Sequence, residues 1–278
     1  MIEPYFKEKN FILYLGDTLE ILNQIEPEKF QLIFADPPYL LSNDGITCSS
    51  GKMVSVNKGD WDKSQGFDDD MQFINSWLKC CKRVLKENGT IWISGTFHVI
   101  FKVGYLLEKN NFDIINDIIW YKPNAPPNLS CKYFTHSHEI LLWARKNKDS
   151  HHTFNYEKMK KWDNQKDKLK NKDKQMRSVW SIPIIPKAEK KFGKHPTQKP
   201  LELLNRIIMS SSDEGDTVLD PFVGSGSTGI VCSILKRKFI GIDISKEFLD
   251  LAIKRYKDKD KKTLLFYPED GNRITNYI

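Results

Sequence analysis

The chain has 278 residues, a formal net charge of +7 and a hydrophobic content of 40%. A chain of this length and composition can bury a sizeable core, so these numbers exclude a globally disordered protein. The positive charge favours a polyanionic partner without proving one. The N-terminus has no basic and apolar leader, and no apolar run is long enough to span a bilayer, which predicts a cytoplasmic protein without membrane contact.

The pattern of cysteines argues against a structural role for disulfides. The sequence has five: Cys48, Cys80, Cys81, Cys131 and Cys232. Their number is odd and no Cys-x-x-Cys pair is present, which disfavours both a disulfide framework and a zinc site. His136 and His138 lack a closed set of further ligands around them. We therefore expect no metal site.

Strands and helices alternate along most of the sequence. Apolar runs typical of strands lie at residues 11–15, 31–35, 90–94, 113–120, 139–144, 217–220 and 239–243. Helical spacing of apolar residues follows at 19–25, 73–85, 99–108, 200–209 and 228–235, and the second of these helices is expected to stop at Asn88-Gly89. This alternation predicts an α/β fold with a mainly parallel sheet and helices on both faces.

Two segments interrupt the alternation. Residues 40–66 are rich in Ser, Asn, Asp and Gly, which predicts a long mobile loop. Residues 146–193 carry many lysines interleaved with acids and no sustained apolar period, which indicates an inserted region. The α/β domain is then divided into residues 1–145 and 194–278. Trp92, Trp120 and Trp143 lie in strand-like runs and are predicted to be core residues.

The tetrapeptide Asp36-Pro37-Pro38-Tyr39 comes directly after the apolar run 31–35. It is therefore expected at the carboxyl end of a strand, where open α/β sheets bind their ligands. Asp-Pro-Pro by itself is most often a turn. At this position, however, a carboxylate, an extended backbone and an aromatic face suit a flat base that bears an amino group.

A glycine-rich turn, Gly224-Ser225-Gly226, follows the predicted strand 217–220 and opens a helix. Glycines in this context let the backbone approach a ligand closely. Asp243 ends the next strand about twenty residues on, where an acid can accept both hydroxyls of a ribose. The turn lacks Gly-Lys-Ser/Thr, which disfavours a phosphate-cradling loop, so the pair predicts a nucleoside-containing cofactor.

Together the two motifs resemble those of the S-adenosylmethionine-dependent amino-methyltransferases of DNA, and their order is similar to the permuted β class. Residues 34–39, 54–63, 128–136 and 193–200 look like the DpnA-type second methyltransferases of DpnII-type restriction systems, which act on adenine in GATC. The resemblance covers nearly the whole chain. It implies a Rossmann-like seven-stranded sheet in permuted order, with a catalytic half (1–145), a target-recognition insert (146–193) and a cofactor-binding half (194–278).

The resemblance also implies roles for individual residues. Gly224 and Gly226 would pass under the cofactor, Asp243 would bind its ribose, and residues 197–199 would close on its methionine end. The full set implied to bind S-adenosylmethionine is Asp17, Thr18, Asp36, Thr197, Gln198, Lys199, Asp220, Phe222, Gly224, Ser225, Gly226, Thr228 and Asp243.

Catalysis is predicted for Asp36, Pro37, Pro38 and Tyr39. The exocyclic amine of adenine is a poor nucleophile, so the Asp36 carboxylate and the Pro37 carbonyl are expected to accept its protons and aim its lone pair at the methyl group. Tyr39 is expected to stack on the base after it flips from the duplex. Contacts with DNA are predicted for Lys58, Trp61, Lys132, His136, Lys158, Lys160, Lys161 and Arg177.

The predicted substrate is double-stranded DNA, with single-stranded DNA left open. A homodimer is expected, as is a cognate restriction endonuclease that forms no stable complex with the chain. Four alternatives stay open: methylation of cytosine N4, of adenine in RNA or of glutamine in a protein, and a DNA-binding protein that has lost catalysis. Asp rather than Ser at position 36 favours adenine over cytosine as a family tendency.

Overall fold

The computed structural model describes residues 2–40, 45–49, 52–56, 62–129, 131–162, 174–190, 192–193 and 195–258. The described strands form one nine-stranded sheet in the order β1-β2-β11-β10-β3-β6-β8-β7-β9 and a separate hairpin, β4-β5. The strands are β1 (Phe6–Glu8), β2 (Phe11–Leu15), β3 (Phe30–Ala35), β4 (Gly45–Ser49), β5 (Lys52–Val56), β6 (Leu85–Gly95), β7 (Asp113–Tyr121), β8 (His138–Arg145), β9 (Val179–Ser181), β10 (Thr217–Asp220) and β11 (Lys238–Asp243).

The sheet is parallel at its centre and mixed towards its edges. Strands β2, β11, β10, β3 and β6 pair in parallel, β8 is antiparallel to both of its neighbours, and β1 is antiparallel to β2. The seven expected strands are all present. Two further strands, β1 and β9, lie at the edges of the sheet. The sequence does not predict them, because three residues are too few to show a strand period.

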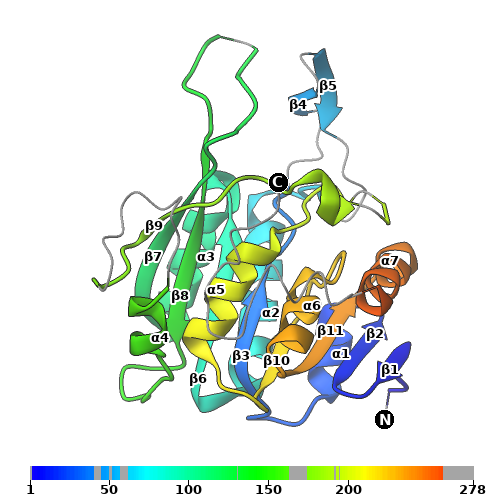
Figure 1. Cartoon of the computed structure of the whole chain (residues 1–278), viewed down its shortest axis with the longest axis vertical. Coiled ribbons are helices and arrows are strands. Elements are labelled where there is room, and N and C mark those ends of the chain that lie inside the picture. The colour runs from blue at the N-terminus through cyan, green and yellow to red at the C-terminus, as the bar shows by residue number, and fades with distance from the viewer. Residues whose placement is uncertain are drawn as a thin grey trace.

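Helices cover both faces of the sheet, as the alternation predicts (Figure 1). They are α1 (Thr18–Gln24), α2 (Phe67–Val84), α3 (Phe97–Lys109), α4 (Tyr156–Lys160), α5 (Leu201–Ser211), α6 (Ser227–Ile234) and α7 (Lys246–Lys257). Helices α1 to α3 contribute to one hydrophobic core, and α4 to α7 contribute to a second. Strand β3 is buried along its whole length because both cores use its side chains.

The parallel strands bring distant acids to one edge of the sheet. Asp36 follows β3, Asp220 ends β10, and Asp243 ends β11. Strand β10 lies between β3 and β11, so these three carboxyl ends are neighbours. The chain leaves β3 towards β6 on one side and leaves β10 towards β11 on the other, which makes this the point where an open α/β sheet forms its ligand crevice.

Helix α2 ends earlier than the sequence predicts. It stops at Val84, and Asn88 and Gly89 lie inside β6 instead of capping the helix. Leu85 is already extended and pairs with Phe30 of β3, so pairing with the sheet takes over before the Asn-Gly signal is reached. Gly89 is needed for packing, because a Cβ there would lie 2.8 Å from the Leu85 side chain.

Several described residues between 146 and 193 pack into the second hydrophobic core, the one to which α4 to α7 contribute. Met159, Trp162, Trp180 and Ile182 belong to the same core cluster as α5 and α6. The guanidinium of Arg206 on α5 lies 5.5 Å from the ring centre of Trp162 and 4.9 Å from that of Trp180. Strand β9 also joins the sheet beside β7. This segment is therefore built into the fold, where lysine content alone predicts a separate insert.

The predicted loop at residues 40–66 contains regular structure. Its described part holds the antiparallel hairpin of β4 and β5, whose strands pair from Gly45–Val56 to Ser49–Lys52. Figure 1 shows this hairpin and the connection between β7 and β8 projecting from the same end of the molecule. Helix α4 lies towards the opposite end. No helix within the described ranges is long and apolar enough to cross a membrane.

Candidate active site

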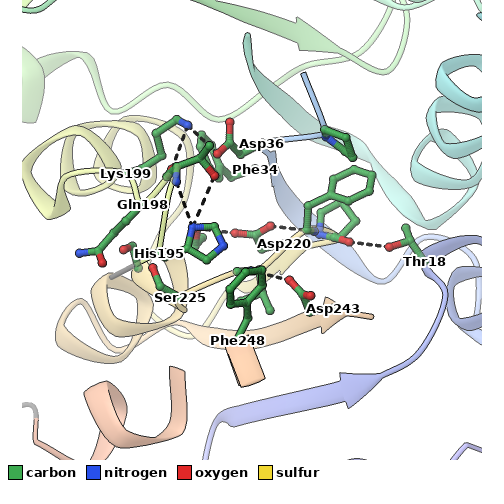
Figure 2. A pocket seen from close by; sticks show the side chains of 18 of the residues that line it. Thr18, Phe34, Asp36, His195, Gln198, Lys199, Asp220, Ser225, Asp243 and Phe248 are labelled. Atoms are coloured by element: carbon green, nitrogen blue, oxygen red, sulfur yellow. Dashed lines mark hydrogen bonds and ion pairs between the residues drawn. The ribbon is translucent and has the colours of Figure 1, made fainter. Parts of the chain in front are cut away.

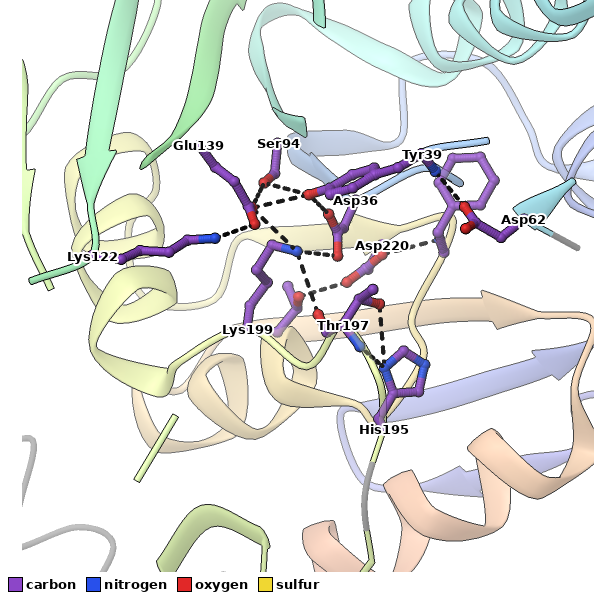
Figure 3. Close-up of polar contacts among 12 residues, drawn as sticks. Asp36, Tyr39, Asp62, Ser94, Lys122, Glu139, His195, Thr197, Lys199 and Asp220 are labelled. Carbon is purple, nitrogen blue, oxygen red and sulfur yellow. Dashed lines mark hydrogen bonds and ion pairs between the residues drawn. The ribbon is translucent and has the colours of Figure 1, made fainter. Parts of the chain in front are cut away.

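Asp36 lies at the centre of a buried polar cluster (Figure 3). The Lys199 ammonium donates to its Oδ2 at 2.5 Å, and the Tyr39 hydroxyl donates to its Oδ1 at 2.7 Å. Lys199 comes from the segment that leads into α5, so a residue 163 positions away completes this site. Both carboxylate oxygens of Asp36 thus accept from a donor of the protein.

Glu139 is a second carboxylate in the same cluster. Its Oε2 accepts from the Tyr39 hydroxyl at 3.0 Å and from Ser94 Oγ at 3.3 Å, and it lies 3.7 Å from Lys199 Nζ. Its Oε1 forms an ion pair with Lys122, at the end of β7. The sequence does not single out Glu139, Ser94 or Lys122 as site residues; the only available signal is that each stands at the carboxyl end of a predicted strand or at the start of one.

The charges of this cluster depend on its burial. Burial raises the pKa of the Asp36 carboxyl and the charge of Glu139 adds to this, while the ammonium of Lys199 opposes it. For Lys199, burial lowers the pKa, but the two carboxylates outweigh it and leave the pKa raised. Burial also opposes ionisation of Glu139, yet Lys199 and Lys122 bring its pKa down to about 2. Lys199 therefore stays cationic and Glu139 anionic at neutral pH.

Asp62 fixes the backbone of the tetrapeptide. Its Oδ1 accepts from the backbone N–H groups of Tyr39 at 2.7 Å and of Leu40 at 2.9 Å, and the side chain is fully buried. Leu40 has a positive φ of 58°, so the chain turns sharply just after Tyr39. The carboxylate of Asp62 holds this turn, which keeps Asp36 and Tyr39 pointing into the same cluster.

A pocket adjoins Asp36 at the carboxyl ends of β3, β10 and β11 (Figure 2). Almost every residue predicted for the cofactor lines it: Asp17, Thr18, Asp36, Thr197, Gln198, Lys199, Asp220, Phe222, Gly224, Ser225, Thr228 and Asp243. The same wall includes Phe34, His195, Ile244 and Phe248, which the sequence does not single out. Four carboxylates and several aromatic rings thus face one cavity.

Hydrogen bonds of the glycine turn orient two of these carboxylates. Asp243 accepts from the backbone N–H of Gly224 at 2.8 Å and from that of Ser245 at 2.9 Å. Asp220 accepts from Thr228 Oγ1 at 2.5 Å and from the Phe222 N–H at 3.0 Å. Burial raises the pKa of Asp220 to about 7, so its charge changes near neutral pH.

His195 supports the turn from the other side. Its ring packs edge-on to Phe248 with centroids 4.2 Å apart, and a Cβ on Gly224 would lie only 2.9 Å from its Nε2. Gly224 also has a positive φ of 48°, which a side chain disfavours. Glycine at 224 is therefore required by both the backbone and the imidazole.

A family model described as DNA methylase matches residues 30–254, which include every acid of the pocket and cluster except Asp17. The chain belongs to the DNA methylase family. This family transfers methyl groups from S-adenosylmethionine.

Curated members of this methylase family match the chain over almost its full length. Type II methyltransferase M2.DpnII of Streptococcus pneumoniae is 51% identical over 262 residues, covering 94% of this chain and 95% of that protein. M2.LlaDCHI of Lactococcus lactis subsp. cremoris is 52% identical, covering 92% of each. These matches confirm the resemblance to second methyltransferases of DpnII-type systems.

Solved methyltransferases share the fold. The crystal structure of the M1.HpyAVI–SAM complex aligns with a TM-score of 0.63 and 28% identity, covering 88% of this chain and 98% of that one. The cytosine-N4-specific PvuII DNA methyltransferase aligns with a TM-score of 0.70, covering 94% and 92%. At 18% identity the PvuII comparison shows the fold alone.

Two predicted residues of this methylase occupy other places than expected. Gly226 does not line the pocket; it begins α6 with a φ of 77°, and a Cβ there would lie 2.6 Å from Ala252 Cβ on α7. Lys199 lines the pocket, but its ammonium pairs with Asp36. Gly226 thus serves helix packing, and the Lys199 ammonium is bound to the Asp36 carboxylate.

Tyr39 is held differently from a stacking platform. Its side chain is only 4% exposed, and its hydroxyl contacts Asp36, Ser94 and Glu139. Lys199 Nζ lies 5.2 Å from its ring centre. The hydroxyl is therefore part of the polar cluster, and stacking on a base stays a prediction that requires the ring to become exposed.

The predicted DNA contacts are split between the two ends of the molecule. Lys132 and His136 are exposed in the connection between β7 and β8, at the active-site end. Lys158 of α4 pairs with Asp213, which follows the C-terminal end of α5. Lys160 and Lys161 form the C-terminal end of α4. Arg177 precedes β9 at the sheet's outer edge. Lys58 and Trp61 lie outside the described residues.

Lys158 of α4 and the Asp36 cluster lie at opposite ends of α5. Helix α5 has 11 residues, so its two ends are about 16 Å apart. Lys199 and Asp36 are at one end, and Asp213 with its partner Lys158 is past the other. The length of α5 thus separates Lys158 from the end of the sheet that carries Asp36. Within the described part of the chain, no group of three or more His, Cys, Asp or Glu side chains forms a metal site.

Proposed function

We propose that this DNA methylase transfers the methyl group of S-adenosylmethionine to N6 of an adenine flipped out of double-stranded DNA. The observation that carries the proposal is the placement of Asp36, which lines the pocket and directly follows the last residue of β3. One carboxylate can therefore meet both the amine and the methyl donor. Adenine rather than cytosine is supported by Asp at this position and by the relatives at 51% and 52% identity.

The residues of the pocket fit a cationic nucleoside cofactor. Asp36, Asp220 and Asp243 supply negative charge that suits a sulfonium and an ammonium group. Phe34, Phe222 and Phe248 offer apolar walls for an adenine ring. We assign the ribose hydroxyls to Asp243, because its carboxylate stands at the end of β11 beside the backbone of Gly224.

The protein's own part in the transfer is to activate the amine. The Asp36 carboxylate and the Pro37 carbonyl accept the two N6 protons, which draws the lone pair out of the ring and aims it into the pocket. When bound, the cofactor supplies the methyl group, whose bond to sulfur breaks with the electron pair left on sulfur as the N6 lone pair forms the new bond. The surplus N6 proton passes to Asp36, whose pKa is raised by burial and so favours taking it.

The active-site end offers the surface for the DNA. Lys132 and His136 project with the β7-β8 connection near the catalytic end of the sheet, and we propose that they contact the phosphate backbone. Trp61 directly precedes Asp62, and Lys58 lies four positions before it. We propose that both residues also contact the DNA. Residues 146–193 are proposed to take part in target recognition through the surfaces not tied to α5.

The recognition sequence and the partners are proposals as well. GATC is supported by the similarity to M2.DpnII and by the motifs at 128–136 and 193–200. A restriction endonuclease in the same bacterial cytoplasm is supported by the names of the type II relatives. A homodimer is supported by Phe97, Phe101 and Tyr105, which form an exposed stripe at i, i+4 and i+8 along α3.

The decisive experiment is expression in a host that lacks other DNA methylases, followed by modified-base sequencing of the genome. We expect N6-methyladenine at GATC. Methylcytosine in place of methyladenine would overturn the assignment of the base. Methyladenine in another sequence would overturn GATC and leave the reaction standing, and unmodified DNA would refute the function.

A further inference from the structure

Glu139 is a buried acid that the proposed transfer does not use. It is 8% exposed and stands near the start of β8, next to the ends of β6 and β7. It does not line the cofactor pocket. Its Oε2 nevertheless shares two donors with Asp36, the Tyr39 hydroxyl at 3.0 Å and the Lys199 ammonium at 3.7 Å.

The Lys199 ammonium and the Tyr39 hydroxyl compete with the substrate amine for the Asp36 carboxylate. The incoming amine brings N–H donors to the carboxylate, but Lys199 and Tyr39 already donate to one oxygen each, which weakens the remaining lone pairs as acceptors. The Lys199 contact is the stronger competitor, because it is a buried ion pair of 2.5 Å. A single hydroxyl proton on Tyr39 can serve only one of the two carboxylates at a time.

We propose that Glu139 is a positioning residue that takes over Lys199 and the Tyr39 hydroxyl when the adenine amine binds to Asp36. The inference rests on the proposed function. Lys199 needs to move by only about 1 Å to exchange its 2.5 Å contact with Asp36 for an equal one with Glu139, which is now 3.7 Å away. Both donors therefore have a second acceptor within reach, and neither is left buried without one.

The surroundings of Glu139 suit this role. Lys122 holds Oε1, so Oε2 is the oxygen that faces Tyr39 and Lys199. Ser94 on β6 donates to the same oxygen at 3.3 Å and fixes its direction. The charged and titratable groups around the cluster are Asp36, Tyr39, Lys122, Lys199 and, acting on Lys199 from β10, Asp220. Two carboxylates and two ammonium groups give the exchange a constant total charge.

The test is Glu139→Gln, which keeps the size of the side chain and removes its charge. Steady-state methylation of a duplex oligonucleotide that contains the genomic target site is expected to fall roughly 10- to 100-fold in kcat. The dissociation constant of S-adenosylmethionine, measured by calorimetry, should stay unchanged because Glu139 lies outside the pocket. Glu26→Gln, in the exposed turn before the amino end of β3, is the matched control and should leave kcat unchanged.

The pH profile separates positioning from a structural role. The charge of Glu139 raises the pKa of Asp36, so its removal lowers that pKa and moves the acid limb of kcat to lower pH. Glu139→Asp keeps the charge and should restore the limb and part of kcat, which also guards against a Gln variant that fails to fold. A Gln variant with normal kcat, or with lost kcat and an unmoved acid limb, would overturn the inference. Adenine methylation by the unaltered protein would still stand in either case.

Discussion

The cofactor side and the catalytic side of this site are built in different ways. On the proposed cofactor side, one continuous β10-α6-β11 unit supplies Asp220, Gly224, Thr228 and Asp243 within 24 residues, and other segments complete the pocket. The catalytic side is assembled from β3, β6, β7, β8 and the segment before α5, with Lys199 joining Asp36 across 163 positions. The binding of the donor and the activation of the amine should therefore fail independently.

The largest effect is expected for Asp36→Ala. Removing the carboxylate takes away the acceptor for the N6 protons and should lower kcat by about a thousandfold or more. Calorimetry should still detect S-adenosylmethionine, because the glycine turn and Asp243 do not depend on Asp36 for their hydrogen bonds. Asp36→Asn is the matched variant and should be equally inactive, since its amide cannot accept a proton. Normal turnover in either variant would contradict the assignment of Asp36.

The sequence predicts the residues of the proposed cofactor side better than those of the proposed catalytic side. The turn at 224–226 and Asp243 were predicted because their spacing within one βαβ unit carries the signal. Glu139, Ser94 and Lys122 were missed because only the strand order β3-β6-β8-β7 brings them together. Lys199 was assigned to the cofactor through the resemblance of residues 197–199 to a family segment; it does line the pocket, and the sequence could not show that its ammonium reaches Asp36.

Local rules also misjudged elements that tertiary packing decides. The Asn88-Gly89 signal is a good helix stop, but β3 recruits Leu85 into the sheet first. Lysine content suggested a solvated insert, yet Trp162 and Trp180 enclose Arg206 in the core. Gly226 matched the glycine motif correctly, but the contact that requires a glycine there comes from Ala252 on α7.

A second prediction separates side-chain overlap from backbone strain at Gly226. Gly226→Ala forces a side chain onto a φ of 77° and places its Cβ 2.6 Å from Ala252, so we expect a loss of about 2–4 kcal/mol in the free energy of unfolding. Gly215→Ala is the control, because Gly215 has a φ of 86° but nothing within 4 Å of a Cβ. It should cost about 1 kcal/mol from backbone strain alone. Denaturant unfolding of both variants measures the difference, and equal losses would show that the overlap with α7 relaxes.

A third prediction concerns pH and the donor site. Burial raises the pKa of Asp220 to about 7, so the carboxylate becomes charged as pH rises from about 6 to about 8. The affinity for cationic S-adenosylmethionine should increase several-fold over that window. Titration calorimetry at each pH is the measurement, and Asp220→Asn should flatten the dependence. A steep dependence in the Asn variant would assign it to another group.

The same shift predicts the opposite trend for the unliganded protein. Because the pKa of Asp220 is higher in the folded state, its contribution to stability is fully present below its unfolded pKa and is lost as pH rises through about 7. Glu189, whose pKa burial also raises to about 7, adds to this loss. The free energy of unfolding should therefore fall as the affinity for the cofactor rises, and Asp220→Asn should remove part of the fall.

The smallest effect is expected where DNA meets the surface, and it compares the two ends of the sheet. Lys132→Ala should weaken binding of a duplex a few-fold and reduce the slope of log affinity against log salt by about 0.9, because one phosphate contact is lost. Lys158→Ala should change neither quantity, since Lys158 is engaged with Asp213 at the end of the sheet far from Asp36. Fluorescence anisotropy at several salt concentrations measures both. Equal effects of the two variants would mean that the duplex also contacts α4, and the proposed difference between the two ends of the sheet would be wrong.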